Sequence, residues 1–120
     1  MSNQSRDQDI QYAEGVLPLY EKVFGKDAIL FDCLERARRL NAERPKIGDF
    51  ELMYSAERHV KNKALGNGRF EDLSADEKTA YWAGMACVYT IRGAGGALNV
   101  VKPFIDKLSG GNPLTRPSQA

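Results

Sequence analysis

The fold of this chain is decided by residues 74–89, which read SADEKTAYWAGMACVY. Ser74 and Glu77 have the spacing of a capping box, in which each side chain accepts a hydrogen bond from a backbone amide of the first helical turn. From residue 80 onward the stretch is apolar almost all round, which is typical of a helix in the centre of a domain. Small residues such as Ala83 and Gly84 allow another helix to approach closely. We therefore expect this helix to be the central element of the fold.

Two amphipathic helices are predicted in the first third of the chain. Apolar residues spaced three and four apart indicate a helix over about residues 7–24, although Pro18 predicts either a kink or a fresh helix start. A second helix is expected over about residues 27–41, with Asp27 as its N-cap. Both helices present one apolar face, so both are expected to pack on the central helix.

Two further helices are predicted around the central one. Asp49 is the expected N-cap of a helix over about residues 49–65. Its expected buried side consists of Phe50, Met53, Tyr54, Ala56, Val60 and Ala64. After the glycine-rich stretch 92–96, helical spacing resumes over residues 97–108, and Pro103 predicts a kink or a helix beginning afresh.

Together these segments predict an all-α fold, a compact irregular or orthogonal bundle of four to five helices. No useful length of sequence alternates with period two, so strands are not expected. Prolines inside two segments and the glycine-rich stretch argue against long, straight, parallel packing. We expect residues 1–108 to form a single helical domain and residues 109–120, SGGNPLTRPSQA, to form a flexible tail.

Composition indicates a globular chain that stays in the cytoplasm. The 120 residues are 42% hydrophobic and 28% charged, which is too apolar for disorder. The longest stretch without a charge, residues 79–91, is far shorter than the roughly 20 residues that cross a bilayer. The first nine residues are polar where a secretory signal would become apolar. Cys33 and Cys87 fall on apolar helix faces and are expected to be reduced, buried thiols.

The formal net charge of +1 conceals a segregation of charge along the chain. Residues 1–35 carry a net charge of −4, residues 36–69 carry +5, and the remainder carries 0. The basic part supplies the candidate contacts with a partner protein or a nucleic acid. These are Arg36, Arg38, Arg39, Arg44, Lys46, Arg58, Lys61, Lys63 and Arg69. If the two helices that carry them are antiparallel, the cations form two patches; at a wide angle they converge on one.

No metal or cofactor site is expected. Metal sites need several converging ligands, whereas this chain has one histidine, His59, and two isolated cysteines. We interpret His59 as a solvated surface residue. A nucleophilic triad needs a histidine as its base and would have to use His59, so a triad is not expected. The glycines of residues 92–97 follow a helix and match neither a dinucleotide-binding fingerprint nor a P-loop.

Catalytic residues are not expected either. Carboxylates are the one class of acid or base with several members close in sequence. The candidates are Glu57, Glu71, Asp72, Asp76 and Glu77. Capping and solvation at a helix start explain most of them without any raised pKa. A small enzyme would require two of these carboxylates to meet in a cleft.

By elimination, the sequence favours a non-catalytic protein-binding module: an adaptor, a regulator or an inhibitor. A mobile-element accessory protein that blocks a larger host complex would have this size and this lack of catalytic motifs. The alternative is a nucleic-acid-binding protein that uses the basic stretch 36–69, although acidic residues interleave it and no exposed aromatics are expected beside it. A homodimer is open if Tyr81, Trp82 or Tyr89 is exposed.

Overall fold

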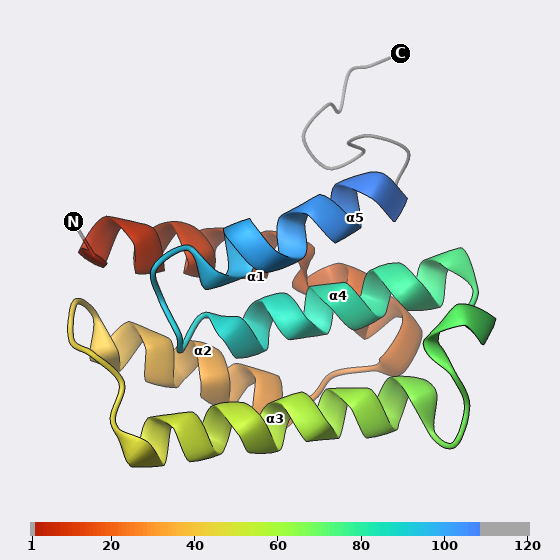
Figure 1. The fold of residues 1–120 in the computed structure, drawn as a ribbon, viewed down its shortest axis with the longest axis horizontal. Coiled ribbons are helices and arrows are strands. Elements are labelled where there is room, and N and C mark those ends of the chain that lie inside the picture. The colour runs from red at the N-terminus through yellow and green to blue at the C-terminus, as the bar shows by residue number, and fades with distance from the viewer. Residues whose placement is uncertain (1, 109–120) are drawn as a thin grey trace.

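The computed structural model describes residues 2–108, with side chains from Arg6 onward, and this part of the chain is helical without any strand (Figure 1). The elements are α1 (Ser2–Phe24), α2 (Ala28–Leu40), α3 (Ile47–Leu65), the short 3-10 helix η1 (Phe70–Asp72), α4 (Ala75–Tyr89), the π-helix η2 (Gly96–Val101) and α5 (Lys102–Leu108). The predicted all-α class and the number of helices are therefore confirmed for the described residues. The expected flexible tail, residues 109–120, lies outside them.

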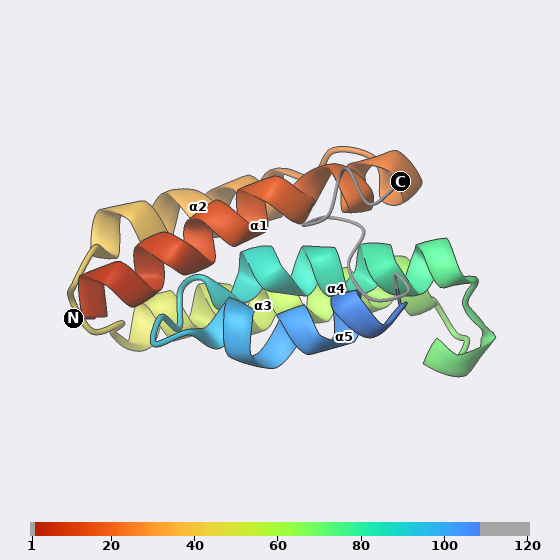
Figure 2. The same ribbon diagram turned by 90° about the horizontal axis from the view of Figure 1, so that it is seen from above.

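Helix α4 occupies the centre of the fold, as its sequence predicts. It packs against α1, α2, α3, η2 and α5. Seen from above, α1 and α2 lie on one side of the molecule, and α3, α4 and α5 lie on the other (Figure 2). Along that second side α3 and α4 run antiparallel, and the chain then reverses again into η2 and α5 (Figure 1). The middle helix of this side is therefore flanked by α3 and by η2–α5.

The predicted capping box starts α4. The Ser74 Oγ atom accepts a hydrogen bond from the Glu77 amide at 3.1 Å, and the Ser74 amide donates to Glu77 Oε1 at 2.9 Å. Near the middle of the helix, the ring of the fully buried Tyr20 lies directly over Gly84. A Cβ atom at Gly84 would come within 2.8 Å of that ring, so only glycine lets α1 and α4 approach this closely.

One predicted helix start needs correction, and of the two alternatives at Pro18 the fresh helix start is not observed. Helix α1 runs through Pro18 as one helix, so no new helix begins there. Burial of the residues around Pro18, such as Val16 and Tyr20, holds the helix together despite the missing amide donor.

Helix α3 begins at Ile47, before the expected N-cap Asp49. The Oδ2 atom of Asp49 instead accepts a hydrogen bond from the Lys46 amide at 2.8 Å. Pro103 lies in the first turn of α5, where proline is tolerated, and α5 follows the π-helix η2 without a non-helical residue between them.

Arg6 joins three parts of the chain, a role that the sequence did not predict. Its side chain is only 4% exposed, and its guanidinium donates to four backbone carbonyls. The acceptors are the oxygen atoms of Thr90 (3.3 Å), Ile91 (3.0 Å), Glu43 (3.0 Å) and Asn41. Gly93 lies against the guanidinium with φ at 71°, and a Cβ atom there would come within 2.7 Å of Arg6. Burial lowers the pKa of Arg6, with the nearby Asp9 and Asp49 opposing that effect.

Asp9, one helical turn after Arg6, holds the start of η2. Its side chain is fully buried, and its Oδ1 atom accepts a hydrogen bond from the Leu98 amide at 3.2 Å. Burial raises the pKa of Asp9, although hydrogen bonds from the first backbone amides of η2 act in the opposite direction. A carboxylate at this position satisfies amide groups that the helix itself leaves free. The N-terminal turns of α1 therefore fix both the end of α4 and the start of η2.

None of the helices within residues 2–108 combines the length and the apolar character needed to span a membrane.

Candidate functional site

The nine basic candidates separate into two groups, because α2 and α3 are antiparallel neighbours (Figure 1). The cations of residues 36–46 lie near the turn that joins the two helices. Those of residues 58–69 lie further along α3 or beyond its end. Arg58 and Lys61 line a common hollow, whereas Arg38 and Arg39 do not line it. The arrangement in which all the cations converge on one surface is therefore wrong.

Four of the nine cations form ion pairs with carboxylates. The ion pairs are Arg36–Asp49 at 2.6 Å, Arg38–Glu14, Lys63–Asp27 at 4.0 Å and Arg69–Glu71 at 3.8 Å. The acidic N-terminal third of the sequence thus supplies partners for part of the basic middle. Of the nine candidates, Arg44, Arg58 and Lys61 form no ion pair within the described residues, and all three line hollows on the surface.

Three neighbouring hollows share lining residues, and we call them together the α4 groove. Its central part has a volume of about 430 Å³ and is lined by Phe50, Met53, Tyr54, Glu57, Tyr89, Arg92 and Val100. One end, of about 290 Å³, shares Tyr54 and Glu57 with the centre and adds Arg58 and Lys61. The other end, of about 300 Å³, shares Arg92 and is lined also by Arg6, Ala42, Glu43, Arg44, Pro45 and Ala94. The centre of the groove therefore lies between α3, the end of α4 and η2, one end lies along α3, and the other lies beside the turn between α2 and α3.

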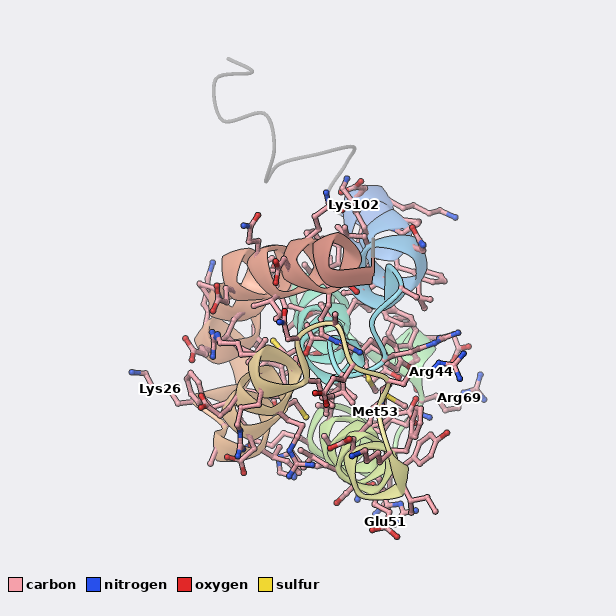
Figure 3. The ribbon with its side chains drawn as sticks, turned by 90° about the vertical axis from the view of Figure 1, so that its left-hand side faces the viewer. Lys26, Arg44, Glu51, Met53, Arg69 and Lys102 are labelled. Carbon is pink, nitrogen blue, oxygen red and sulfur yellow. The ribbon has the colours of Figure 1, made fainter. Side chains whose placement is uncertain are left out.

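Figure 3 shows how several labelled side chains project from the helices. Met53 points from α3 into the body of the molecule, whereas Glu51 points outward from the same helix. Arg44 projects on the side of the molecule opposite Lys26. The end of the groove that Arg44 lines is thus on the opposite side of the molecule from Lys26.

Tyr54 is the most exposed aromatic residue of the groove, which contradicts two expectations. It was expected on the buried side of its helix, and no exposed aromatic was expected beside the basic residues. Its side chain is instead 55% exposed and stacks on Phe50, with ring centroids 6.3 Å apart. The apolar face of α3 is wider than the strip that α4 covers, so Tyr54 remains at the edge of the contact.

A hydrogen bond between α4 and α3 fixes the middle of the groove. The hydroxyl of Tyr89 donates to Glu57 Oε2 at 2.7 Å. Burial, followed by this hydrogen bond and the charge of Glu57, raises the pKa of Tyr89, so the phenol stays protonated. Glu57 and Arg92 are the two charged residues that line the central hollow. Of the five carboxylates considered for catalysis, Glu57 lines the groove and the other four do not.

The opposite side of the groove is formed by the π-helix. Residues 94 and 95 have positive φ angles of 53° and 76°, and the wider π-turn begins directly after them at Gly96. Through this geometry Val100 reaches the central hollow, while Val101 is fully buried. Single π-turns occur often at functional sites because they displace side chains from the regular helical positions. The sequence pattern 97–108 predicted an ordinary helix here and missed this feature.

His59 is not simply solvated, as the sequence suggested. It is 39% exposed, but its Nε2 atom lies 2.8 Å from Asp27 Oδ2, which also accepts the Tyr20 hydroxyl at 2.6 Å. Burial raises the pKa of Asp27, but the hydrogen bonds from Tyr20 and His59 and the charges of His59 and Lys63 outweigh it, so the pKa is lowered. Asp27 precedes α2 as predicted, yet its carboxylate makes these contacts instead of capping that helix. The cluster ties α1, α2 and α3 together.

The two cysteines are free and fully buried, as expected. Burial raises the pKa of Cys33 and of Cys87 to about 12 in each case. Thiolates are the reactive form of cysteine, so neither side chain is activated as a nucleophile. Among the side chains described for residues 6–108, no group of three or more His, Cys, Asp or Glu residues is placed to hold a metal ion.

The aromatic residues that bear on a homodimer are largely covered. Tyr81 is only 8% exposed, and Trp82 stacks on Phe104 with ring centroids 4.4 Å apart. Tyr89 is half-buried and bonded to Glu57. Of the aromatic side chains on α4, none is therefore fully open to a second copy.

No known protein family, curated protein or solved structure matches this chain.

Proposed function

We propose that this chain is a non-catalytic protein-binding module that holds a segment of a partner protein in the α4 groove. The observation that supports this proposal is the exposure of Tyr54 next to cations that lack ion-pair partners among the described residues. Exposed aromatic residues and arginines are enriched where proteins bind one another. The roles open to such a module are those of an adaptor, a regulator or an inhibitor, including an accessory protein that blocks a larger host complex.

The contacts made by the groove residues support binding more than chemistry. Its central carboxylate, Glu57, is already held by the hydroxyl of Tyr89. The free thiols lie elsewhere, fully buried, which suits a reducing compartment such as the cytoplasm. Preformed surfaces of this kind bind without a large ordering cost, so moderate affinity needs only a few well-placed side chains.

Affinity capture from cells that naturally express the chain tests the proposal. The wild-type chain is compared with Tyr54→Ala in the groove and with Phe31→Ala on α2. Phe31 is a matched control because it is 44% exposed and does not line the groove. We expect a protein that survives nuclease treatment, is retained by Phe31→Ala and is lost with Tyr54→Ala. Loss of every partner after nuclease treatment, or equal capture by all three chains, would overturn the proposal.

A further inference from the structure

We infer that the occupant of the α4 groove is an extended acidic segment of a partner protein with one large apolar residue near its middle. This inference rests on the proposed function and specifies the chemistry of the partner. It depends on three features of the groove: the placement of its charges, its apolar centre and its length.

Most cations of the groove lie at its two ends, and Arg92 also borders the centre. Arg58 and Lys61 line one end, while Arg44 and Arg92 line the other. All four side chains are exposed, and none forms an ion pair with a carboxylate in the described part of the chain. The acidic lining residues are Glu43 and Glu57, so the cations are in excess. Carboxylates on a partner would therefore find complementary charge at both ends.

Between these charges the groove is mainly apolar. The central hollow of about 430 Å³ is lined by Phe50, Met53, Tyr54, Tyr89 and Val100 together with Glu57 and Arg92. A hollow of this size accommodates a large aliphatic or aromatic side chain. The Tyr89 hydroxyl binds the Oε2 atom of Glu57, and the Oε1 atom makes no hydrogen bond among the described residues. It can therefore accept a backbone N–H of the bound segment.

The length of the groove fits a short segment. An α-helix rises about 1.5 Å per residue, so the part of α3 from Phe50 to Lys61 spans about 17 Å. An extended chain advances about 3.3 Å per residue, and about five residues cover that length. Arg44 lies before this part of α3, in the turn that follows α2, which leaves room for one or two more residues.

The same features disfavour a nucleic acid. A single strand carries a phosphate at every nucleotide and is best bound by a continuous run of cations. Here Arg58 and Lys61 lie at one end and Arg44 at the other, while the single cation of the centre, Arg92, shares it with the carboxylate of Glu57. Other cations of the basic stretch, such as Arg36 and Arg38, are already paired with carboxylates. A peptide with acidic ends and an apolar centre matches this pattern better.

Selection from a random heptapeptide display library tests the inference with the purified chain. The wild-type chain is the bait, and Tyr54→Ala serves for counter-selection. We expect the enriched peptides to contain acidic residues on both sides of one large apolar residue. Peptides enriched without acidic residues, or no enrichment over the counter-selection, would overturn the inference. If peptides without acidic residues are enriched and their binding still depends on Tyr54, the proposed protein-binding function survives and only the inferred partner chemistry fails.

Fluorescence titration of an enriched peptide then measures the contribution of each end. We expect Arg58→Gln and Arg92→Gln each to weaken binding about three- to tenfold, as is usual for exposed charge pairs. Tyr54→Ala should weaken it about thirtyfold if the tyrosine is a central contact. Arg39→Gln is the matched control, since Arg39 is an exposed cation that lines no part of the groove. Equal effects of Arg39→Gln and Arg58→Gln, or tighter binding of a thymidine oligonucleotide than of the peptide, would refute the charge argument.

Discussion

Replacing Gly84 with alanine adds a single methyl group at the point where α4 lies against α1. An ideal Cβ atom at this position lies 2.8 Å and 2.9 Å from two ring carbons of Tyr20 and 3.3 Å from a methyl carbon of Val60. Carbon atoms in proteins essentially never approach within 3.0 Å in this way, so one of the helices must shift. The ring cannot easily turn aside, because Tyr20 is fully buried and its hydroxyl is bonded to Asp27 at 2.6 Å.

Two opposing effects set the size of the change. Alanine is favoured over glycine inside a helix by about 1 kcal/mol. Overpacking a well-filled core costs about 1–3 kcal/mol, and the upper value applies where a buried hydrogen bond is also displaced. For Gly84→Ala we therefore expect a net loss of about 2 kcal/mol in the free energy of unfolding. A domain of this size then melts roughly 8 °C lower.

Gly15→Ala provides the matched control. Gly15 also lies within a helix, but a Cβ atom added there would have no neighbouring atom within 4 Å. This variant gains the helical preference without the clash and should be stabilised by up to about 1 kcal/mol. Urea unfolding followed by circular dichroism measures both variants. If Gly84→Ala is as stable as the wild-type chain, α1 and α4 are packed more loosely than these distances indicate, and the argument that glycine is required there is refuted.

Three further predictions concern the buried polar groups. Arg6→Met should lower the free energy of unfolding by about 3–5 kcal/mol, because it leaves four carbonyl acceptors without their donor; a loss below about 1 kcal/mol in urea unfolding would contradict this. The pKa of Asp27 is lowered in the folded chain from an unfolded pKa near 3.8. The stabilisation that the Asp27 carboxylate contributes is therefore complete above the unfolded pKa and is lost as the pH falls through the lower folded pKa. The stability difference between wild type and Asp27→Asn should therefore shrink on acidification below about pH 4, and a constant difference from pH 7 to pH 2 would be inconsistent with it. Cys33 and Cys87, with pKa values of about 12, should react with a thiol reagent at pH 8 only after unfolding, and rapid labelling of the native chain would disprove their burial.

Much of the fold could be predicted from the sequence because its decisive signals are local. The Ser74–Glu77 capping box acts between residues three apart, and the apolar character of α4 is visible in consecutive residues. Helix α2 likewise begins and ends close to its predicted limits. The small residue Gly84 indicated close approach, although only the structure identified Tyr20 as its neighbour.

The groove was only partly predictable. Of the nine basic candidates, Arg44, Arg58 and Lys61 line it, and their presence in a basic stretch was the available signal. Arg92 lies outside that stretch and was missed as a candidate contact. Tyr54 was misplaced because helical periodicity shows which residues share a face, but the width of the contact depends on the neighbouring helix.

The sequence by itself determined which segments are helical and which helix is central, because capping and hydrophobic periodicity act over a few residues. Only the tertiary structure decided the positions of the buried polar groups. Arg6 binds carbonyls that lie 35 to 85 positions away in the chain, and every residue carries a carbonyl, so no sequence pattern marks the acceptors. The contact between His59 and Asp27 joins side chains that are 32 positions apart, and no local pattern links the two residues. Long-range contacts of this kind arise only when the helices have packed.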